Sequence, residues 1–286
     1  MLSFHKIRFP IDFSDRCTQT AAYVAGIARK FNSHVTLLHS FDAYDPFGYG
    51  AASGTEIYGP QISMLWQHRE AAMAEFGSAV LEGIAVDRVI QDGEPSETTA
   101  QYVREHSINL VVMPTYGYGE FRRMLLGSVT SKVLHKVDCP VWATAHCEGL
   151  DNRCGQCISR IVCGVDLQTD SVDIVRAAWE LAEQYGADVR LVHAVGSDML
   201  CGEAPFQRFL VDTAAEKLAS LQNAADTHLD TWVKQGYVAQ VIREAAADYG
   251  ARLAIIGRGR AKKLLGALRT NVNEIIRESP CPVLSL

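Results

Sequence analysis

The sequence predicts an α/β fold in which two domains, each built on an open parallel sheet, follow one another in a chain of 286 residues. Short apolar runs of strand length alternate with longer segments of helical periodicity, an order typical of parallel sheets covered by helices. Four strand patterns of the first half recur in the same order in the second half, which indicates an internal duplication. The composition, with 48% hydrophobic and 21% charged residues, allows each half its own core.

Apolar runs define the strands of the first half, and capping residues with helical periodicity define its helices. We expect strands at 6–14, 34–39, 86–91, 110–113 and 139–144, and helices from Ser14 or Asp15 to Lys30, at 61–81, from Ser96 or Glu97 to His106, and from Ser128 onward. Residues 41–60 hold four glycines and five Tyr or Phe residues without a steady period, which predicts a loop, either solvated or serving as a lid.

The second half repeats four of these strands. Ile161–Asp166 matches Ile7–Asp12, Asp188–His193 matches His34–His39, Leu253–Gly257 matches Leu110–Pro114, and Cys281–Leu284 matches Cys139–Trp142. The predicted domains are residues 1–146 and 159–286, joined by a linker at 147–158. Ligands of such sheets bind at the carboxyl ends of the strands, and this is where Asp12 and the 114–128 loop are expected.

A glycine-rich loop connects the strand at 110–113 to the helix that begins at Ser128. Backbone N–H groups at Gly117, Gly119 and Gly127 can converge on an anion together with the first turn of that helix. The Ser128 hydroxyl can add a further donor. A phosphate chain is the expected ligand of this arrangement.

Charge and hydropathy exclude other classes of protein. A net charge of −6 and a pI near 5.8 argue against a protein that binds nucleic acids or anionic membranes. Such proteins usually have a basic surface. The sequence has no apolar run long enough to span a bilayer and no signal-peptide pattern at its start, so we expect a cytoplasmic protein.

These features resemble the universal stress protein (UspA-like) family in its tandem two-domain form, over nearly the whole chain. Nucleotide-binding members carry G-x2-G-x9-G-[S/T] after the fourth strand and an aspartate that ends the first strand, commonly as P-x-D. Pro10-Ile11-Asp12 fits the second pattern, and Gly117, nine intervening residues and then Gly127-Ser128 fit most of the first. The resemblance implies Rossmann-like, adenine nucleotide alpha hydrolase-like domains that form a pseudo-dimer, with the strands at 139–144 and 281–286 paired.

The resemblance also implies an ATP site in the first half. Asp12 and the backbone near Ser40 would face the adenine and ribose. The implied nucleotide-binding set is Pro10, Ile11, Asp12, Ser40, Met113, Pro114, Gly117, Gly127, Ser128, Val129 and Thr130. Pro114 replaces the first glycine of the pattern, and because proline lacks an N–H and has a fixed φ, we expect binding to be weakened or adjusted rather than abolished.

The second half is predicted to be a degraded copy of this site. Asp166 and Gly257 are retained, but Arg260 stands at the second glycine, and only five residues separate it from Gly266, which Ala267 follows in place of a hydroxyl residue. We expect this half to be structural or regulatory, or to hold a different anion.

The linker between the domains carries a cluster of possible metal ligands. It comprises His146, Cys147, Cys154 and Cys157. Thiolates and an imidazole suit Zn²⁺, the C-x2-C pair could also be a redox dithiol, and the third interpretation is a linker whose cysteines share no role.

Three functions remain open on the sequence. The first is a stress-response sensor or regulator that binds ATP with at most weak hydrolysis, the second a non-nucleotide adaptor acting through protein contacts, and the third a slow Mg²⁺-dependent ATPase. The Walker A, G-x-S-x-G and H-E-x-x-H patterns are absent, and we assign no catalytic residue. The expected partners are an adenine nucleotide, a second copy in a homodimer, and an unidentified regulatory protein.

Overall fold

The computed structural model describes residues 2–41, 59–115, 126–144, 157–168, 170–196, 204–258 and 268–286. The elements of the first half are β1 (Lys6–Pro10), α1 (Asp15–Phe31), β2 (His34–Phe41), α2 (Gly59–Glu75), β3 (Val86–Asp92), α3 (Pro95–His106), β4 (Leu110–Pro114), α4 (Ser128–Lys136) and β5 (Val141–Thr144). Those of the second half are β6 (Arg160–Gly164), α5 (Ser171–Tyr185), β7 (Asp188–Val195), α6 (Ala204–Ala225), β8 (Asp230–Gln235), α7 (Val238–Tyr249), β9 (Leu253–Ile256), α8 (Leu268–Glu278) and β10 (Val283–Ser285). No helix of this part of the chain is long and apolar enough to cross a bilayer.

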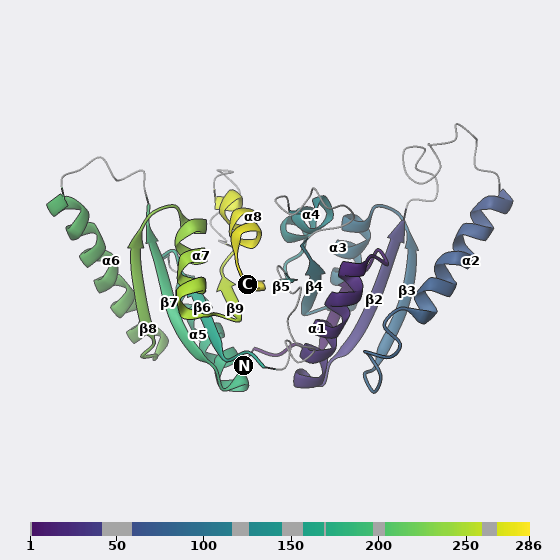
Figure 1. Cartoon of the computed structure of the whole chain (residues 1–286), viewed down its shortest axis with the longest axis horizontal. Helices are drawn as coiled ribbons and strands as arrows, with labels where there is room; N and C mark the ends of the chain where they lie inside the picture. The colour runs from purple at the N-terminus through teal and green to yellow at the C-terminus, as the bar shows by residue number, and fades with distance from the viewer. Residues whose placement is uncertain are drawn as a thin grey trace.

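The described strands form one sheet in the order β3-β2-β1-β4-β5-β10-β9-β6-β7-β8 (Figure 1). Within each half all neighbouring strands are parallel. The predicted fold class, two tandem parallel-sheet domains joined as a pseudo-dimer, is therefore confirmed.

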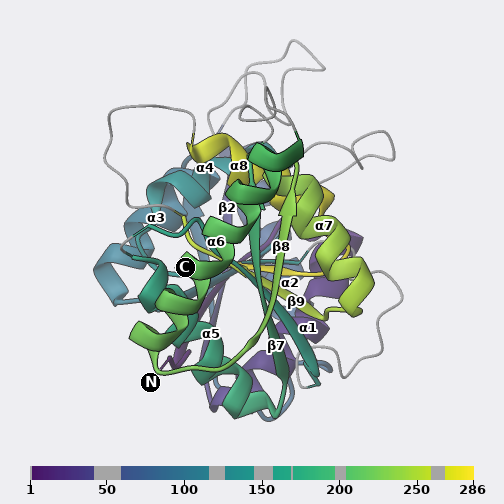
Figure 2. The ribbon, with the colours of Figure 1, turned by 90° about the vertical axis from the view of Figure 1, so that its left-hand side faces the viewer.

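Helices cover both faces of the sheet because the strand residues alternate between two cores. Leu110 and Val112 of β4 belong to the core that α1, α2, α5 and α6 complete, whereas Val111 and Met113 belong to the core of α3, α4, α7 and α8. Figure 2 shows this for the second half, with α5 and α6 on one side of the strands and α7 on the other. The continuous apolar strand pattern is the direct cause of this two-sided burial.

Local chemistry sets where several elements begin and end. The Ser14 hydroxyl accepts from the N–H of Cys17 at 3.4 Å and caps α1, as predicted. The preceding strand ends at Pro10 rather than Ser14, because Phe13 takes a φ of +62° that an extended strand cannot include. The helix expected to reach residue 81 ends at Glu75, and Gly77 then takes a left-handed φ of +67°.

Glu94 caps α3 in place of the predicted Ser96 or Glu97. Its carboxylate accepts from the N–H groups of Ser96 and Glu97 at 2.9 and 3.0 Å. Lys132 of α4 donates to the other oxygen at 3.1 Å. The Ser96 hydroxyl also donates to the carboxylate. Partial burial alone would raise the pKa of Glu94, but the hydrogen bonds from the Ser96 hydroxyl, Lys132 and the Glu97 N–H lower it to about 2. The carboxylate therefore ties the start of α3 to α4.

The two halves are joined by the antiparallel pairing of β5 with β10. Trp142 pairs with Leu284, and Val141 and Ala143 pair with Ser285 and Val283. Trp142 and Leu284 are corresponding residues of the repeat, so the pairing is symmetric about this point. The prediction that the strands at 139–144 and 281–286 pair within the chain is confirmed, while a homodimer of whole chains stays a prediction.

A buried aromatic group and the helices beneath it reinforce this junction. The Trp142 side chain is fully buried, with the rings of Phe4 and Tyr23 centred 6.0 and 5.9 Å from its own. Phe31 of α1 meets Tyr185 of α5 across the junction, with ring centroids 5.9 Å apart. Aromatic contacts of this kind stabilise the pairing beyond the burial of apolar area.

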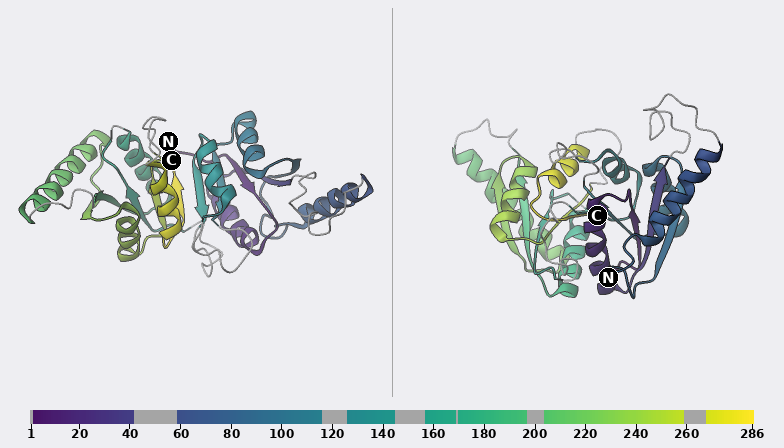
Figure 3. Two further views of the ribbon diagram at one scale, coloured as in Figure 1. Left: turned by 90° about the horizontal axis from the view of Figure 1, so that it is seen from above. Right: turned by 45° about the vertical axis from the view of Figure 1, so that its right-hand side comes forward.

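On the opposite face, Arg258 of the second half caps α4 of the first. Its guanidinium donates to the carbonyl oxygens of Val137 at 2.7 Å and Cys139 at 2.5 Å, just beyond the end of that helix. A cation is stabilised there by the unpaired carbonyls and the negative end of the helix dipole. The Asn273 amide of α8 also donates to Ser131 of α4 at 3.1 Å, so the two helices lie side by side at the centre (Figure 1, Figure 3).

One charged side chain lies inside the first half. Arg8 of β1 is fully buried, with its guanidinium carbon 3.5 Å from the centre of the Tyr102 ring. Its three guanidinium nitrogens have no hydrogen-bond partner among the described residues. The corresponding residue of β6 is Val162, which is buried in the apolar core.

We expect Arg8→Met to raise the free energy of unfolding by about 1–3 kcal/mol, because it removes a buried cation whose donors are unpaired. Chemical denaturation of the full chain measures this. Val162→Arg, which introduces the same charge at the corresponding position, should destabilise. A clear loss of stability in Arg8→Met would show that the cation–π contact with Tyr102 outweighs the desolvation cost.

Glu94 should make stability depend on pH in the acid range. Its pKa in the folded chain is depressed to about 2 from 4.5, so its contribution is present above pH 4.5 and is lost as the pH falls toward about 2. Urea unfolding should show the difference between wild type and Glu94→Gln shrinking over this range. Glu216→Gln, on the exposed surface of α6, is the control. A difference that stays constant with pH would contradict the proposed cap.

Candidate functional site

The carboxyl ends of β1, β2 and β4 lie at one edge of the first half, because these neighbouring strands are parallel. Pro10, Ile11 and Asp12 follow or end β1, Ser40 lies near the end of β2, and Met113 and Pro114 end β4. Gly127, Ser128, Val129 and Thr130 lie at the start of α4, which follows β4 in the chain. The structure thus gathers the described residues of the predicted nucleotide set at this edge.

A tight turn holds the Asp12 carboxylate. Its Oδ1 accepts from the N–H of Ser14 and from the thiol of Cys17, both at 3.0 Å. Burial raises the pKa of the Cys17 thiol, which therefore stays protonated and remains a donor. The second carboxylate oxygen, Oδ2, has no hydrogen-bond partner among the described residues, so it is available to accept from a ligand.

The same turn recurs in the second half. Asp166 Oδ1 accepts from the N–H of Gln168 at 3.0 Å and from the hydroxyl of Ser171 at 2.8 Å. Leu167, like Phe13, takes a positive φ, here +59°. The strained residue after each aspartate lets the chain fold back around the carboxylate. The duplication has therefore kept this part of the site in both halves.

The start of α4 is an uncapped helix terminus. Gly127 is the N-cap and has no side chain to bond the first turn, while the Ser128 side chain is exposed. The N–H groups of the first turn, starting with Ser128 and Val129, are those that a helix cannot satisfy internally. Together with the positive end of the helix dipole, they form a site for an anion.

Two residues of the predicted nucleotide set already use a donor within the chain at this terminus. The N–H of Gly127 donates to the carbonyl of Thr115 at 2.7 Å, in contrast to the expectation that it faces an anion. A Cβ at Gly127 would lie 3.2 Å from the same oxygen, so glycine permits this close approach. The Thr130 hydroxyl donates to the carbonyl of Pro114 at 2.9 Å. The donors that remain are those of Ser128 and Val129.

The residues of β2 and β4 contribute mainly through their backbone. The Ser40 hydroxyl accepts from Thr98 of α3 at 2.6 Å, and the Met113 side chain is buried in the core. His39 Nδ1 lies 2.9 Å from the carbonyl of Ile11, and burial lowers the pKa of His39. A neutral His39 that donates to Ile11 is thus a packing residue.

Several predicted site residues lie outside the described part of the chain. They are Gly117, Arg260, Gly266, His146, Cys147 and Cys154. Cys157 is described and exposed. Within the described ranges no group of three or more His, Cys, Asp or Glu side chains is placed to hold a metal ion. The zinc and redox interpretations of the linker therefore stay predictions.

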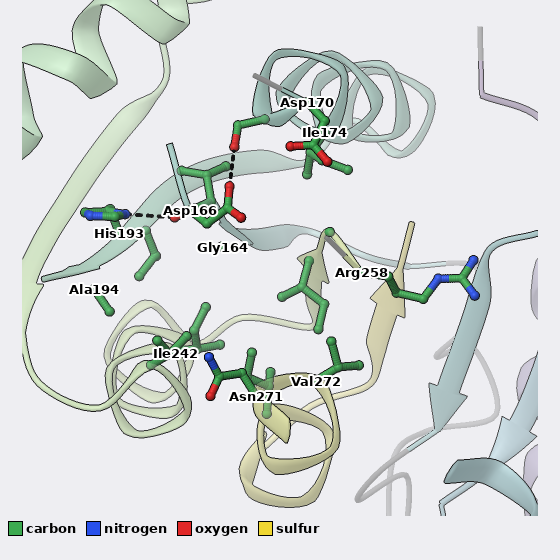
Figure 4. Close-up of a pocket in the computed structure, with 17 residues that line it drawn as sticks. Gly164, Asp166, Asp170, Ile174, His193, Ala194, Ile242, Arg258, Asn271 and Val272 are labelled. Carbon is green, nitrogen blue, oxygen red and sulfur yellow. Dashed lines mark hydrogen bonds between the residues drawn. The ribbon is translucent and has the colours of Figure 1, made fainter. Parts of the chain in front are cut away.

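The second half contains a cavity of about 240 Å³ at the carboxyl ends of β6, β7 and β9 (Figure 4). Asp166, Ser171, His193 and Asn271 are polar residues of its lining, and most of the remaining lining is Val and Ile. From the sequence we expect a degraded copy of the first site in this half, and the cavity is not predicted.

Two glycines were the sequence signal that could have indicated it. Gly164 and Gly257 line the cavity where the first half has Pro10 and Pro114. A Cβ at Gly164 would lie only 2.3 Å from Cδ1 of Ile242, so glycine leaves the space that the Ile242 side chain occupies. Glycine in place of proline at these two positions changes how much space is left between the carboxyl ends of the strands.

Comparison with known proteins agrees with this architecture. The model of the universal stress protein family matches the chain twice, over residues 3–144 and 158–286. A universal stress protein of Methanocaldococcus jannaschii is 26% identical over 139 residues, which cover 48% of this chain and 80% of that protein.

Solved structures show the same tandem fold. A universal stress protein from Archaeoglobus fulgidus superposes with a TM-score of 0.71 at 18% identity, covering 100% of this chain and 97% of its own. A functionally unknown protein from Pseudomonas aeruginosa gives a TM-score of 0.66 at 17% identity, covering 99% and 92%. At these identities the likeness concerns the fold. With the family model matched in both halves, the chain belongs to the universal stress protein family, in its tandem two-domain form.

Proposed function

We propose that this universal stress protein binds an adenine nucleotide, ATP, in its first half and acts as a cytoplasmic sensor or regulator in the stress response. The observation that carries the proposal is the uncapped start of α4, which follows the strand next to that of Asp12. The start of α4 offers hydrogen-bond donors and the positive end of a helix dipole. Asp12, at the end of the neighbouring strand β1, offers a carboxylate acceptor. A nucleotide has the complementary groups, since its phosphates are anionic and its ribose and adenine carry donors.

In this binding mode each described residue has a distinct role. Asp12 Oδ2 accepts from a ribose hydroxyl or from the adenine amine, as acidic residues do in other parallel α/β folds. The N–H groups of Ser128 and Val129 and the Ser128 hydroxyl donate to phosphate oxygens. Pro114 has no N–H to donate, and its carbonyl already accepts from Thr130. Proline at position 114 is therefore compatible with the hydrogen-bond donors at the start of α4.

Regulation by binding is better supported than rapid turnover. Hydrolysis needs a water molecule positioned beside a base. Asp12 Oδ1 is held by Ser14 and Cys17, and His39 Nδ1 by Ile11. In the proposed binding mode Asp12 Oδ2 faces the ribose or the adenine rather than the phosphates, and His39 Nε2 is buried inside the protein. Neither group is placed as that base, so we propose at most weak ATP hydrolysis, with any Mg²⁺ entering with the nucleotide.

Gly127→Asp is the sharpest test. An aspartate at an N-cap accepts from the first-turn N–H groups, which stabilises the helix by only a few tenths of a kcal/mol relative to glycine, but it repels phosphate from the same donors. We expect ATP affinity, measured by titration calorimetry, to fall at least about tenfold, which corresponds to about 1.4 kcal/mol. The chain should stay folded, because the small gain from the new cap opposes the cost of placing a Cβ 3.2 Å from the Thr115 carbonyl.

The matched control is Gly196→Asp, which adds the same charge after β7, where a Cβ would meet nothing within 4 Å. This variant should bind ATP in the first half like the wild type. Absence of ATP binding by the wild-type chain would overturn the proposed function. Unchanged binding by Gly127→Asp would instead show that the nucleotide does not bind at the start of α4.

A further inference from the structure

Within the described residues 126–144, helix α4 has no local cap at either end. Gly127 at its start makes no side-chain hydrogen bond, and Val137 at its end is extended, with φ −100° and ψ 144°. The helices α1, α3, α5 and α7 each end at a residue with a left-handed φ, a conformation in which backbone N–H groups bond the last carbonyls. These residues are Asn32, Ser107, Gly186 and Gly250. The carbonyls at the end of α4 need another partner.

Arg258 of the second half is that partner. Its guanidinium donates to the carbonyl oxygens of Val137 and Cys139 at 2.7 and 2.5 Å. Longer hydrogen bonds of 3.4 Å reach the carbonyls of Leu134 and Asp138. A cation at this place also meets the negative pole of the helix dipole. One charged side chain from the other half therefore replaces the left-handed turn that ends the other helices.

The junction between the halves fixes Arg258 in this position. Its N–H donates to the carbonyl of Leu286, just beyond β10, at 2.9 Å. Its side chain points away from the cavity of its own half and toward the first half (Figure 4). The corresponding residue of the first half is Thr115, which is buried and uncharged. The first half therefore has no cation at this position to offer α8, and the cap acts in one direction.

The first half holds α4 at its start and middle. The Thr130 hydroxyl donates to the carbonyl of Pro114, and Val133 and Leu134 are buried in the core. The end of the helix is where the second half contributes, through Arg258.

A second residue of the other half supports the first turn of α4. The Asn273 amide of α8 donates to the Ser131 hydroxyl at 3.1 Å. The N–H of Ser131 closes the first hydrogen-bonded turn, since it donates to the carbonyl of Gly127 at 2.9 Å. The second half thus contacts α4 near the donors that would meet a phosphate as well as at the opposite end.

These contacts have a large effect on order because α4 is short. It has nine residues, and helices of fewer than about 12–15 residues are marginal without tertiary contacts. The free N–H groups at its start point at one place only while the helix is formed. A site that is formed in only a fraction of the molecules binds its ligand with an affinity reduced by that fraction.

We propose that Arg258 is a positioning residue for the nucleotide site of the other half. By capping α4 it keeps the helix formed, and the second half thereby sets the affinity of the first half for phosphates. This inference rests on the proposed function, in which the phosphates bind at the start of the same helix. Since the ligand and Arg258 stabilise one helix from opposite ends, each strengthens the binding of the other.

Arg258→Ala and Arg258→Lys in the full chain are the test variants. Hydrogen exchange of residues 128–137, read by mass spectrometry without ligand, reports on the order of α4, and titration calorimetry reports on ATP affinity. In Arg258→Ala we expect faster exchange in this segment and an ATP affinity at least about fivefold lower, the low end of coupling between linked sites. Arg258→Lys keeps a cation at the helix end and should bind ATP within about twofold of the wild type.

Two control variants separate this effect from general weakening of the junction. Tyr185→Leu removes the aromatic contact with Phe31 across the junction and leaves α4 untouched. Arg252→Ala removes an exposed arginine of the same half. Both should match the wild type in exchange of residues 128–137 and in ATP affinity. Thermal unfolding must show that each variant is folded, and Arg258→Gln, which keeps an amide donor, replaces Arg258→Ala if the latter is not.

Equal ATP affinity in the wild type and a folded Arg258→Ala would overturn the inference and leave the proposed function intact. Unchanged exchange of residues 128–137 in that variant would overturn it too. An equal loss of affinity in Tyr185→Leu would show that any loosening of the junction has the same effect, against a specific role of Arg258. A wild-type chain that binds no ATP would overturn the proposed function instead, and the exchange measured without ligand would then decide whether Arg258 keeps α4 formed.

Discussion

The pairing of β5 with β10 is the constraint on which the rest of the molecule depends. Each parallel sheet ends in a short strand whose outer N–H and C=O groups need partners, and an open edge of this kind promotes association between chains. Here the corresponding residues Trp142 and Leu284 face each other in an antiparallel register. Each half therefore supplies the other with the partner that it lacks. The two α/β units become one sheet, with the Trp142 side chain buried at its centre.

This union has a chemical consequence for the second half. Arg258 follows Gly257 at the end of β9, where a cation would suit an anionic ligand. Its guanidinium is instead bonded to carbonyl oxygens beyond the end of α4, in the other half. The same helix presents its opposite end, at Gly127 and Ser128, to the proposed nucleotide site. The guanidinium of Arg258 in the second half therefore stabilises α4 of the first half instead of facing the strand ends of its own half.

The two halves have kept one part of a common design and changed another. The aspartate turn is retained with equivalent hydrogen bonds, from a thiol at Asp12 and from a hydroxyl at Asp166. The strand ends differ, because prolines in the first half correspond to glycines in the second. Proline removes a donor, whereas glycine leaves room for neighbouring side chains. The duplicated fold therefore offers different backbone donors and different space at its two sets of strand ends.

The sequence by itself determined the architecture. Apolar runs of strand length and helical periodicity predicted the parallel domains, because burial on both faces of a sheet leaves a readable pattern. The repeated Cys-Pro-Val pattern before Trp142 and Leu284 identified corresponding strands, and the resemblance to the universal stress protein family implied that they pair. Capping was predictable only in part, since Ser14 behaved as expected but Glu94 replaced the expected cap of α3. Only the tertiary structure decided where the Arg258 side chain goes, that the Gly127 N–H is used within the chain, and that the second half encloses a cavity. These features depend on partners more than ten residues away in the sequence, and no local pattern records which distant carbonyl or side chain will be nearest.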